Sequence, residues 1–146
     1  MDGITYLAEA HRRLQKLFSE CNSFEATRRK ELARQINSEL LVLLETEERV
    51  FYPALRHVSP RNAGPSIVDH AAIRALMWEL SIVDVDDRDF EQCLARLQEA
   101  VNTHIQEAEA PSGILEQART EFDAAELTRL THLMLRVKAR CSSDRQ

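Results

Sequence analysis

The sequence predicts an all-α fold, namely an antiparallel up-down four-helix bundle followed by one additional C-terminal helix. Three glycines and four prolines among 146 residues are well under the roughly 12% of typical chains, so tight turns must be few. Aromatic residues make up only 5%, and the chain is rich in residues that favour helices over strands. Apolar residues recur every three or four positions, which is the spacing of one helix face.

Four short breaks divide the chain into segments that are long enough for helices and too long for strands. They lie at 21–23, 59–66, 84–89 and 111–113. Within the third break, Asp87 or Asp89 is a candidate N-cap for the helix that follows. Because the connections are short, successive helices are expected to run antiparallel to one another.

The first two helices each carry a single apolar stripe opposite a charged face, so each stripe is expected to face the interior. In the first helix the stripe consists of Ile4, Leu7, His11, Leu14 and Phe18. In the second helix it consists of Leu32, Ile36, Leu40, Leu43, Glu47, Val50 and Ala54.

The third and fourth helices repeat this pattern. The third stripe consists of Ile67, His70, Ile73, Met77 and Leu80. The fourth consists of Phe90, Leu94, Leu97, Val101, His104 and Ala108. The fifth helix would pack on the outside of the bundle through Leu127, Leu130, Met134 and Val137. We therefore expect one domain over residues 1–146, with the bundle over about 2–111 and the extra helix over about 115–140.

Charge and cysteine content narrow the class of protein. The formal net charge is -5, which argues against nucleic-acid binding. No segment approaches the roughly 20 apolar residues of a membrane helix, and the N-terminus lacks the basic and then apolar pattern of a signal peptide. The three cysteines show no CxxC spacing. We therefore expect reduced thiols and a cytoplasmic location.

Four polar residues occupy stripe positions where apolar residues are expected, one on each bundle helix: His11, Glu47, His70 and His104. A buried imidazole or carboxylate is costly unless a partner satisfies it. A single inward histidine is usually a hydrogen-bonded core residue, but three on different helices beside an inward glutamate favour a shared site. Helix bundles build metal sites in this way, and mixed imidazole and carboxylate ligands suit iron, manganese or zinc.

Several short motifs are spread along the chain. ITYL at 4–7 precedes His11, EERVFYPAL spans 47–55, and HIQE spans 104–107. Together with the lone His70 and the linker DVDDRDF at 84–90, these motifs resemble hemerythrin-like HHE cation-binding domains. The resemblance extends from about residue 2 to residue 140. It implies a pair of bridged irons inside the bundle, used to store or sense oxygen, to handle nitric oxide or peroxide, or to sense iron.

The metal ligands that this resemblance implies are His11, Glu47, His70, His104 and Glu109. Three positions that usually carry ligands in the family hold other residues here. They are Leu43 one turn before Glu47, Arg74 four residues after His70, and Ala108 four residues after His104. The ligand set is therefore smaller than that of an oxygen-carrying hemerythrin.

Two readings of the function follow from this reduced set. In the first, the protein binds non-haem iron at an altered di-iron centre or at a mononuclear one of two histidines and one carboxylate, with oxygen, peroxide or nitric oxide as the small ligand. In the second, the bundle is metal-free and serves as a regulatory or protein-interaction module. Leu43 and Ala108 would then fill the core, since apolar replacement of buried polar groups often stabilises a protein. An enzymatic role is not favoured, because nothing in the sequence indicates an organic substrate.

Other residues have simpler interpretations. We expect Glu45, Glu48 and Glu107 on or near solvated faces rather than at the metal. Tyr52 is expected to bond a neighbouring helix through its hydroxyl. Trp78 is expected to pack under the fifth helix or at a dimer contact, so a homodimer or another protein partner stays open.

Overall fold

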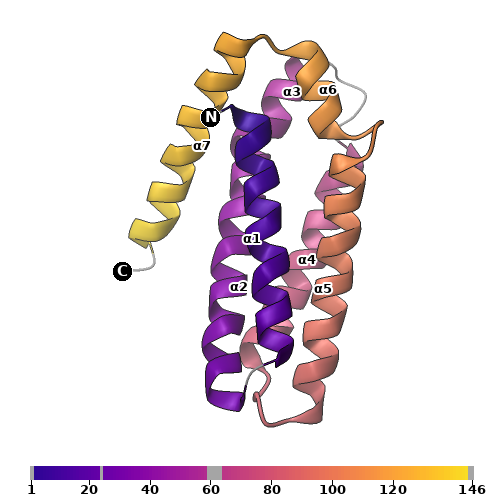
Figure 1. Cartoon of the computed structure of the whole chain (residues 1–146), viewed down its shortest axis with the longest axis vertical. Coiled ribbons are helices and arrows are strands. Elements are labelled where there is room, and N and C mark those ends of the chain that lie inside the picture. The colour runs from indigo at the N-terminus through magenta and orange to yellow at the C-terminus, as the bar shows by residue number, and fades with distance from the viewer. Residues whose placement is uncertain (1, 24, 59–63, 145–146) are drawn as a thin grey trace.

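Four long helices form the bundle (Figure 1). The computed structural model describes residues 2–23, 25–58 and 64–144, with no side chains described at 64–68 and 143–144. The bundle helices are α1 (Gly3–Ser23), α2 (Ala26–Thr46), α4 (Gly64–Ile82) and α5 (Arg88–Glu109). Of the predicted break at 59–66, residues 59–63 fall outside this description, as does the predicted inward position of Ile67, and 64–66 already belong to α4. The predicted break at 21–23 is the end of α1, so it was placed too early. The predicted breaks at 84–89 and 111–113 separate helices, although α5 already begins at Arg88.

Each bundle helix contacts two others, so that the four form a closed ring of neighbours. α1 packs against α2 and α4 against α5, while α2 also contacts α4 and α1 also contacts α5. The described residues contain helices, turns and bends but no strand. The all-α prediction is therefore confirmed, and so is Asp87 as the N-cap of α5, because its side chain accepts a hydrogen bond from the backbone N–H of Asp89.

One turn of the second helix is wound more widely than an α-helix. α2 continues without a break into a π-helical turn (η1, Glu47–Phe51) and then into α3 (Tyr52–Val58). Pro53 follows directly, and proline has no N–H with which to continue the α-helical ladder. Single π-turns inside α-helices are frequent at functional sites, and this one begins with Glu47 and Glu48.

The core is built from the predicted stripes. Leu7, Leu14, Ile36, Leu94 and Leu97 are among its completely or almost completely buried residues. Cys21 and Cys93 lie in the core as free thiols. No described helix combines the length and apolar character that a bilayer crossing requires.

The C-terminal region contains a break that the sequence analysis did not predict. The stretch expected to form one helix over about 115–140 is divided into α6 (Ile114–Glu121) and α7 (Ala124–Asp144). Phe122 between them is extended, with φ -109° and ψ 139°, and its side chain is buried. Asp123 then starts α7, because its carboxylate accepts a 2.8 Å hydrogen bond from the N–H of Glu126.

α7 packs on the outside of the bundle, against α1 and α2 (Figure 1). The contact uses the four predicted residues, all of which are buried: Leu127, Leu130, Met134 and Val137. Gly3 permits the close approach, since a Cβ atom there would lie 2.9 Å from Cε of Met134. The opposite side of the bundle, formed by α4 and α5, is not covered by α7.

Candidate metal centre

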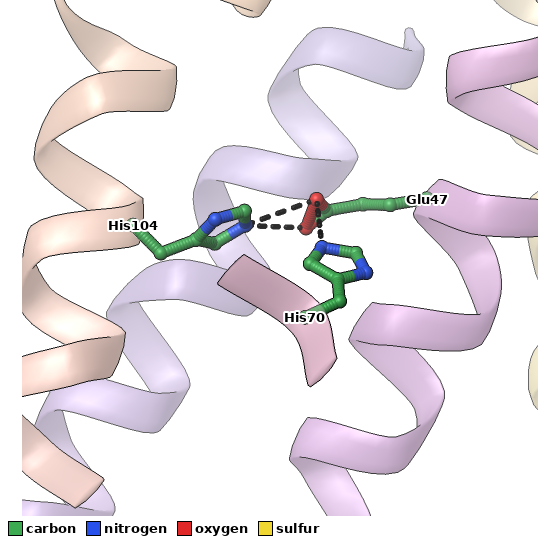
Figure 2. Close-up of side chains that lie close together, drawn as sticks. All are labelled: Glu47, His70 and His104. Carbon is green, nitrogen blue, oxygen red and sulfur yellow. Dashed lines mark hydrogen bonds and ion pairs between the residues drawn. The ribbon is translucent and has the colours of Figure 1, made fainter. Parts of the chain in front are cut away.

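Three of the predicted polar stripe residues converge in the bundle core (Figure 2). Glu47 comes from the π-turn, His70 from α4 and His104 from α5, and their exposed fractions are 1%, 2% and 4%. One ligand atom from each residue lies within 4.8 Å of the other two. Residues far apart in the sequence therefore form one buried cluster, which we call the inner cluster.

Both histidines turn the same ring nitrogen towards the carboxylate of Glu47. Nε2 of His104 lies 3.2 Å from Oε1 and 3.1 Å from Oε2. Nε2 of His70 lies 3.4 Å from Oε2. The two rings meet edge to face, with centroids 5.1 Å apart. Two imidazole nitrogens and a carboxylate thus point at one small region between three helices.

Tyr52 adds a hydroxyl group to the inner cluster. Its O–H donates a 2.5 Å hydrogen bond to Oε2 of Glu47 and lies 3.2 Å from Nε2 of His70. The sequence predicted only a hydrogen bond from Tyr52 to a neighbouring helix. The π-turn provides the reason for the difference, because its wider winding brings residues five apart, such as Glu47 and Tyr52, next to one another.

The other ring nitrogen of His70 is held from outside the cluster. Nδ1–H donates a 2.6 Å hydrogen bond to Oε2 of Glu48. Arg74 donates to the same carboxylate at 2.9 and 3.2 Å and to Glu45 at 3.1 Å. Glu48 therefore lies near the surface, with its side chain 33% exposed, and outside the three ligand residues, but it is hydrogen-bonded to one of them. A carboxylate behind a histidine in this way is typical of metal-ligating histidines.

This hydrogen bond has a consequence for the inner cluster. In the neutral form of His70 the one N–H lies on Nδ1, where Glu48 accepts it, and Nε2 presents a lone pair towards Glu47 and Tyr52. In the protonated form Nε2 carries a second N–H that Glu47 accepts. The single hydroxyl proton of Tyr52 is donated to Glu47 in either case. With His70 neutral, electron-pair donors outnumber protons in the cluster, and either an additional proton or a metal cation would satisfy them.

Charge within the cluster is shared between the carboxylate and the imidazoles. Burial by itself raises the pKa of Glu47, but hydrogen bonds and charge from His104 and His70 lower it well below its usual range. Burial lowers the pKa of His104, but the hydrogen bond and charge of Glu47 outweigh it and raise that pKa above its usual value. Glu47 is therefore ionised, and the proton that it attracts is one that a cation can replace.

The other two predicted ligands, His11 and Glu109, pair with each other instead. Nδ1–H of His11 donates to Oε2 of Glu109 at 2.7 Å, and the guanidinium of Arg12 binds the other oxygen of the same carboxylate. His11 is buried, whereas the Glu109 side chain is 28% exposed. Burial lowers the pKa of His11 more than Glu109 raises it. We call this group the side pair; the described ligand atoms do not join it to the inner cluster.

Leu43, Arg74 and Ala108, which stand where the resemblance would place further ligands, have structural contacts of their own. Leu43 and Ala108 are buried in the apolar core. Arg74 is the cation that holds Glu48 and Glu45. Leu43 and Ala108 therefore contribute to core packing, and Arg74 neutralises neighbouring carboxylates.

An open groove of about 390 Å³ lies between α4 and α5. Its polar lining includes Asp69, Glu99 and Thr103, and its apolar lining includes Ile73 and Leu76. Of the inner cluster, His104 alone is among the residues that line this groove.

The comparisons with known proteins agree with this architecture. Residues 2–110 match the family described as hemerythrin HHE cation binding domain. The match covers α1 to α5, and so includes the inner cluster and the side pair, and it ends before α6 and α7. Neither a curated protein nor a solved structure matches the chain.

Proposed function

The chain belongs to the hemerythrin HHE family, and on that premise we propose that it binds one non-haem iron ion through Glu47, His70 and His104. The observation that carries the proposal is the inner cluster itself. It holds three buried ligand atoms from three helices within 4.8 Å of one another and, with His70 neutral, more electron-pair donors than protons. Mixed nitrogen and oxygen ligands suit iron, and they also suit zinc and manganese.

Such a ligand set supports the binding of a small molecule. Two histidines and one carboxylate leave coordination positions of iron open, and oxygen, nitric oxide or peroxide are ligands of the right size for them. The protein's own residues orient the set: Glu48 holds the ring of His70, and Tyr52 holds the carboxylate of Glu47. The groove that His104 lines is the proposed approach.

A single ion is proposed rather than two because the remaining candidate ligands are already engaged. Glu109 is neutralised by Arg12 and bonded to His11. Leu43 and Ala108 offer no ligand atom. A second ion beside the inner cluster would have to displace the Arg12 ion pair and would still lack several ligands.

Metal analysis tests this proposal. The protein is purified without chelators, loaded anaerobically with ferrous iron and desalted, and about one iron per chain is expected. His70→Ala and His104→Ala should each abolish that iron, whereas the matched control His132→Ala, at an exposed histidine, should retain it. Full iron in either cluster variant would overturn the assignment. Parallel loading with zinc and manganese identifies the preferred metal.

The small ligand is tested on the same samples. Absorption and electron paramagnetic resonance spectra are recorded before and after adding oxygen, nitric oxide or peroxide. A spectral change that is present in the loaded protein and absent in His104→Ala supports the proposed open positions. Identical spectra with all three additions would contradict them.

A second candidate function is a metal-free interaction module, and one observation favours it. The polar groups of the inner cluster bond one another, with Tyr52 and His104 both on Glu47. A protonated cluster is thus self-sufficient at low pH. No iron, zinc or manganese retained after loading at neutral and mildly alkaline pH would select this alternative.

A further inference from the structure

The three buried histidines of the bundle differ in how the outer ring nitrogen is held. Nδ1 of His11 is bonded to Glu109 at 2.7 Å, and Nδ1 of His70 is bonded to Glu48 at 2.6 Å. In both pairs the histidine is buried and the carboxylate is partly exposed. His104 is also buried, but both of its described hydrogen bonds join Nε2 to Glu47. Nδ1 of His104 therefore lacks a carboxylate partner among the described residues.

A histidine that binds metal through Nε2 needs a partner for its other nitrogen. Nε2 must be free of its proton to act as a ligand, so the one N–H of the neutral ring lies on Nδ1. Metal-ligating histidines almost always donate this N–H to a carboxylate, a backbone carbonyl or water. Such a partner fixes the tautomer and the orientation of the ring and makes the nitrogen a stronger ligand. The question for His104 is which residue can accept its Nδ1–H.

The groove between α4 and α5 offers three acceptors beside His104, namely Asp69, Glu99 and Thr103. Glu99 and Thr103 belong to α5, as His104 does. Five residues along an α-helix correspond to about 140° of rotation and about 7.5 Å of rise, so Glu99 leaves the helix on another side than His104. Thr103 is turned by about 100° from it. Asp69 is therefore the acceptor that faces His104 from the opposite wall of the groove.

The height of Asp69 on α4 suits this contact. The rings of His70 and His104 meet with centroids 5.1 Å apart, so these two residues lie at one level of the packed helices. Asp69 directly precedes His70 and lies within about 1.5 Å of that level along the helix axis. Its side chain is half-buried, and no hydrogen bond or ion pair joins it to another described side chain. The carboxylate can thus turn towards Nδ1 without breaking a described bond.

Electrostatics agree with this placement. Burial lowers the pKa of His104, whereas the hydrogen bond and charge of Glu47 raise it, and the charge of Asp69 raises it further. Glu107, three residues after His104, also raises this pKa, but it is exposed and is not among the residues that line the groove. Among the unbonded carboxylates around His104, Asp69 is the one with both the charge effect and the position.

We propose that Asp69 is the positioning residue of His104. With a metal ion bound at Nε2, Nδ1–H of His104 donates to the carboxylate of Asp69 across the groove. This inference rests on the proposed metal site and adds to it. His70 and His104 then each have an outer carboxylate, Glu48 from the π-turn and Asp69 from α4. Because Asp69 precedes His70 directly, α4 supplies one ligand and the support of another.

Metal affinity is the first readout. Zinc serves as the probe, and competition with a chelator of known affinity gives its dissociation constant for the full chain. Asp69→Asn should weaken zinc binding at least about tenfold. Asp69→Glu keeps a carboxylate and should stay within about threefold of the parent. Glu99→Gln is the matched control, because it neutralises another carboxylate of the same groove, and it should have no effect. Circular dichroism verifies that the variants are folded.

Nuclear magnetic resonance of the zinc-loaded, ¹⁵N-labelled protein is the second readout, because zinc is diamagnetic. Two-bond ¹H–¹⁵N spectra identify which ring nitrogen of each histidine carries the proton. Nδ1–H of His104 should appear at low field and exchange slowly with solvent. In Asp69→Asn it should move to higher field and exchange faster, whereas Nδ1–H of His70, bonded to Glu48, should stay unchanged as an internal reference.

The two readouts separate this inference from the metal site on which it rests. A parent protein that binds neither zinc nor iron would overturn both. A parent that binds zinc, with an unchanged affinity in Asp69→Asn, would overturn only the role of Asp69. Weaker binding with an unchanged Nδ1–H signal would mean that Asp69 acts through its charge alone, and would also overturn the proposed hydrogen bond. Equal effects of Glu99→Gln or Glu107→Gln would contradict the choice of Asp69.

Discussion

The inner cluster and the side pair combine the same side chains and differ in what balances their charge. Each contains a carboxylate that is hydrogen-bonded to a buried histidine from another helix. In the inner cluster the ionic partners of Glu47 are two imidazoles, His70 and His104. In the side pair Glu109 is bonded to the guanidinium of Arg12 as well as to His11.

The nature of the positive partner decides whether a metal can enter. An imidazole releases its proton near neutral pH, and its nitrogen is then itself a ligand. A guanidinium keeps its proton at all accessible pH values and has no acceptor. A cation can thus replace the proton of the inner cluster, whereas in the side pair it would have to displace Arg12. In the side pair, Arg12 and His11 together occupy both oxygens of the Glu109 carboxylate.

The largest effect is expected from neutralising the two carboxylates in turn. Glu47→Gln removes the only negative ligand of the proposed site, so iron affinity should fall by more than about 100-fold. Glu109→Gln should leave iron content unchanged, because Glu109 serves the side pair. Iron stoichiometry after anaerobic loading measures both. Equal loss in the two variants would mean that the side pair also binds the metal.

A smaller loss of iron affinity is expected from changing Glu48, which is hydrogen-bonded to the proposed ligand His70. Glu48→Gln weakens the acceptor that orients His70, and changes of this type lower metal affinity about 10- to 100-fold. Glu45→Gln is the matched control, since Glu45 contacts Arg74 and Arg49 but not His70. Competition with a chelator of known affinity gives both constants. If the two variants behave alike, Glu48 acts only through Arg74.

The pH dependence follows from the raised pKa of His104. Because the proton and the metal compete for its Nε2, iron affinity should fall about tenfold for each pH unit below that raised pKa. In the metal-free protein, His104 and Glu47 make contributions to folding stability that depend on pH in opposite directions. His104 stabilises the fold at low pH and loses that contribution as pH rises through its raised pKa. Glu47, with its lowered pKa, stabilises above its ordinary value of 4.5 and loses that contribution as pH falls.

Thermal unfolding with and without iron, between about pH 4 and pH 9, measures this competition. The metal-free protein should be most stable between the ordinary carboxyl value of 4.5 and the raised pKa of His104. The stabilisation by iron should grow on the alkaline side of that range. A stabilisation that does not vary with pH would contradict a site containing His104.

The smallest expected change is a doubling of iron content. Leu43→His with Ala108→Glu returns two family ligands to the bundle, and about two irons per chain are then expected in place of one. The variant should be less stable than the parent without metal, by about 2–4 kcal/mol, because buried apolar groups are exchanged for polar ones. Iron analysis and the absorption spectrum provide the measurement. An unchanged iron content would contradict the view that Leu43 and Ala108 limit the bundle to one ion.

Local patterns in the sequence were sufficient to predict the helices and which face of each points inwards. The stripes containing Leu14, Ile36 and Leu97 all lie in the core. Helix periodicity is a short-range property, so it can be read without knowing the neighbours. The same reasoning predicted one shared site of His11, Glu47, His70 and His104. Glu47, His70 and His104 do converge, whereas His11 pairs with Glu109 instead.

The partners of individual side chains could not be predicted in this way. Glu48 was expected on or near a solvated face, which left open that it would hold His70, and Tyr52 reaches Glu47 only because a π-turn brings them together. The break at Phe122 interrupts a segment with continuous helical character. Each of these features depends on the rotation and height of one helix relative to another, and the sequence pattern of a single helix does not contain that information.

The sequence by itself determined an all-α bundle with a polar, metal-capable interior, because hydrophobic periodicity and residue chemistry act locally along each helix. Only the tertiary structure decided how the five candidate ligands divide. Three share one buried site, and two pair under Arg12, since a hydrogen bond or an ion pair forms only between groups that packing brings within about 3 Å. The same packing left Trp78 uncovered. Its exposure is a property of where α7 docks, which no residue of α4 specifies.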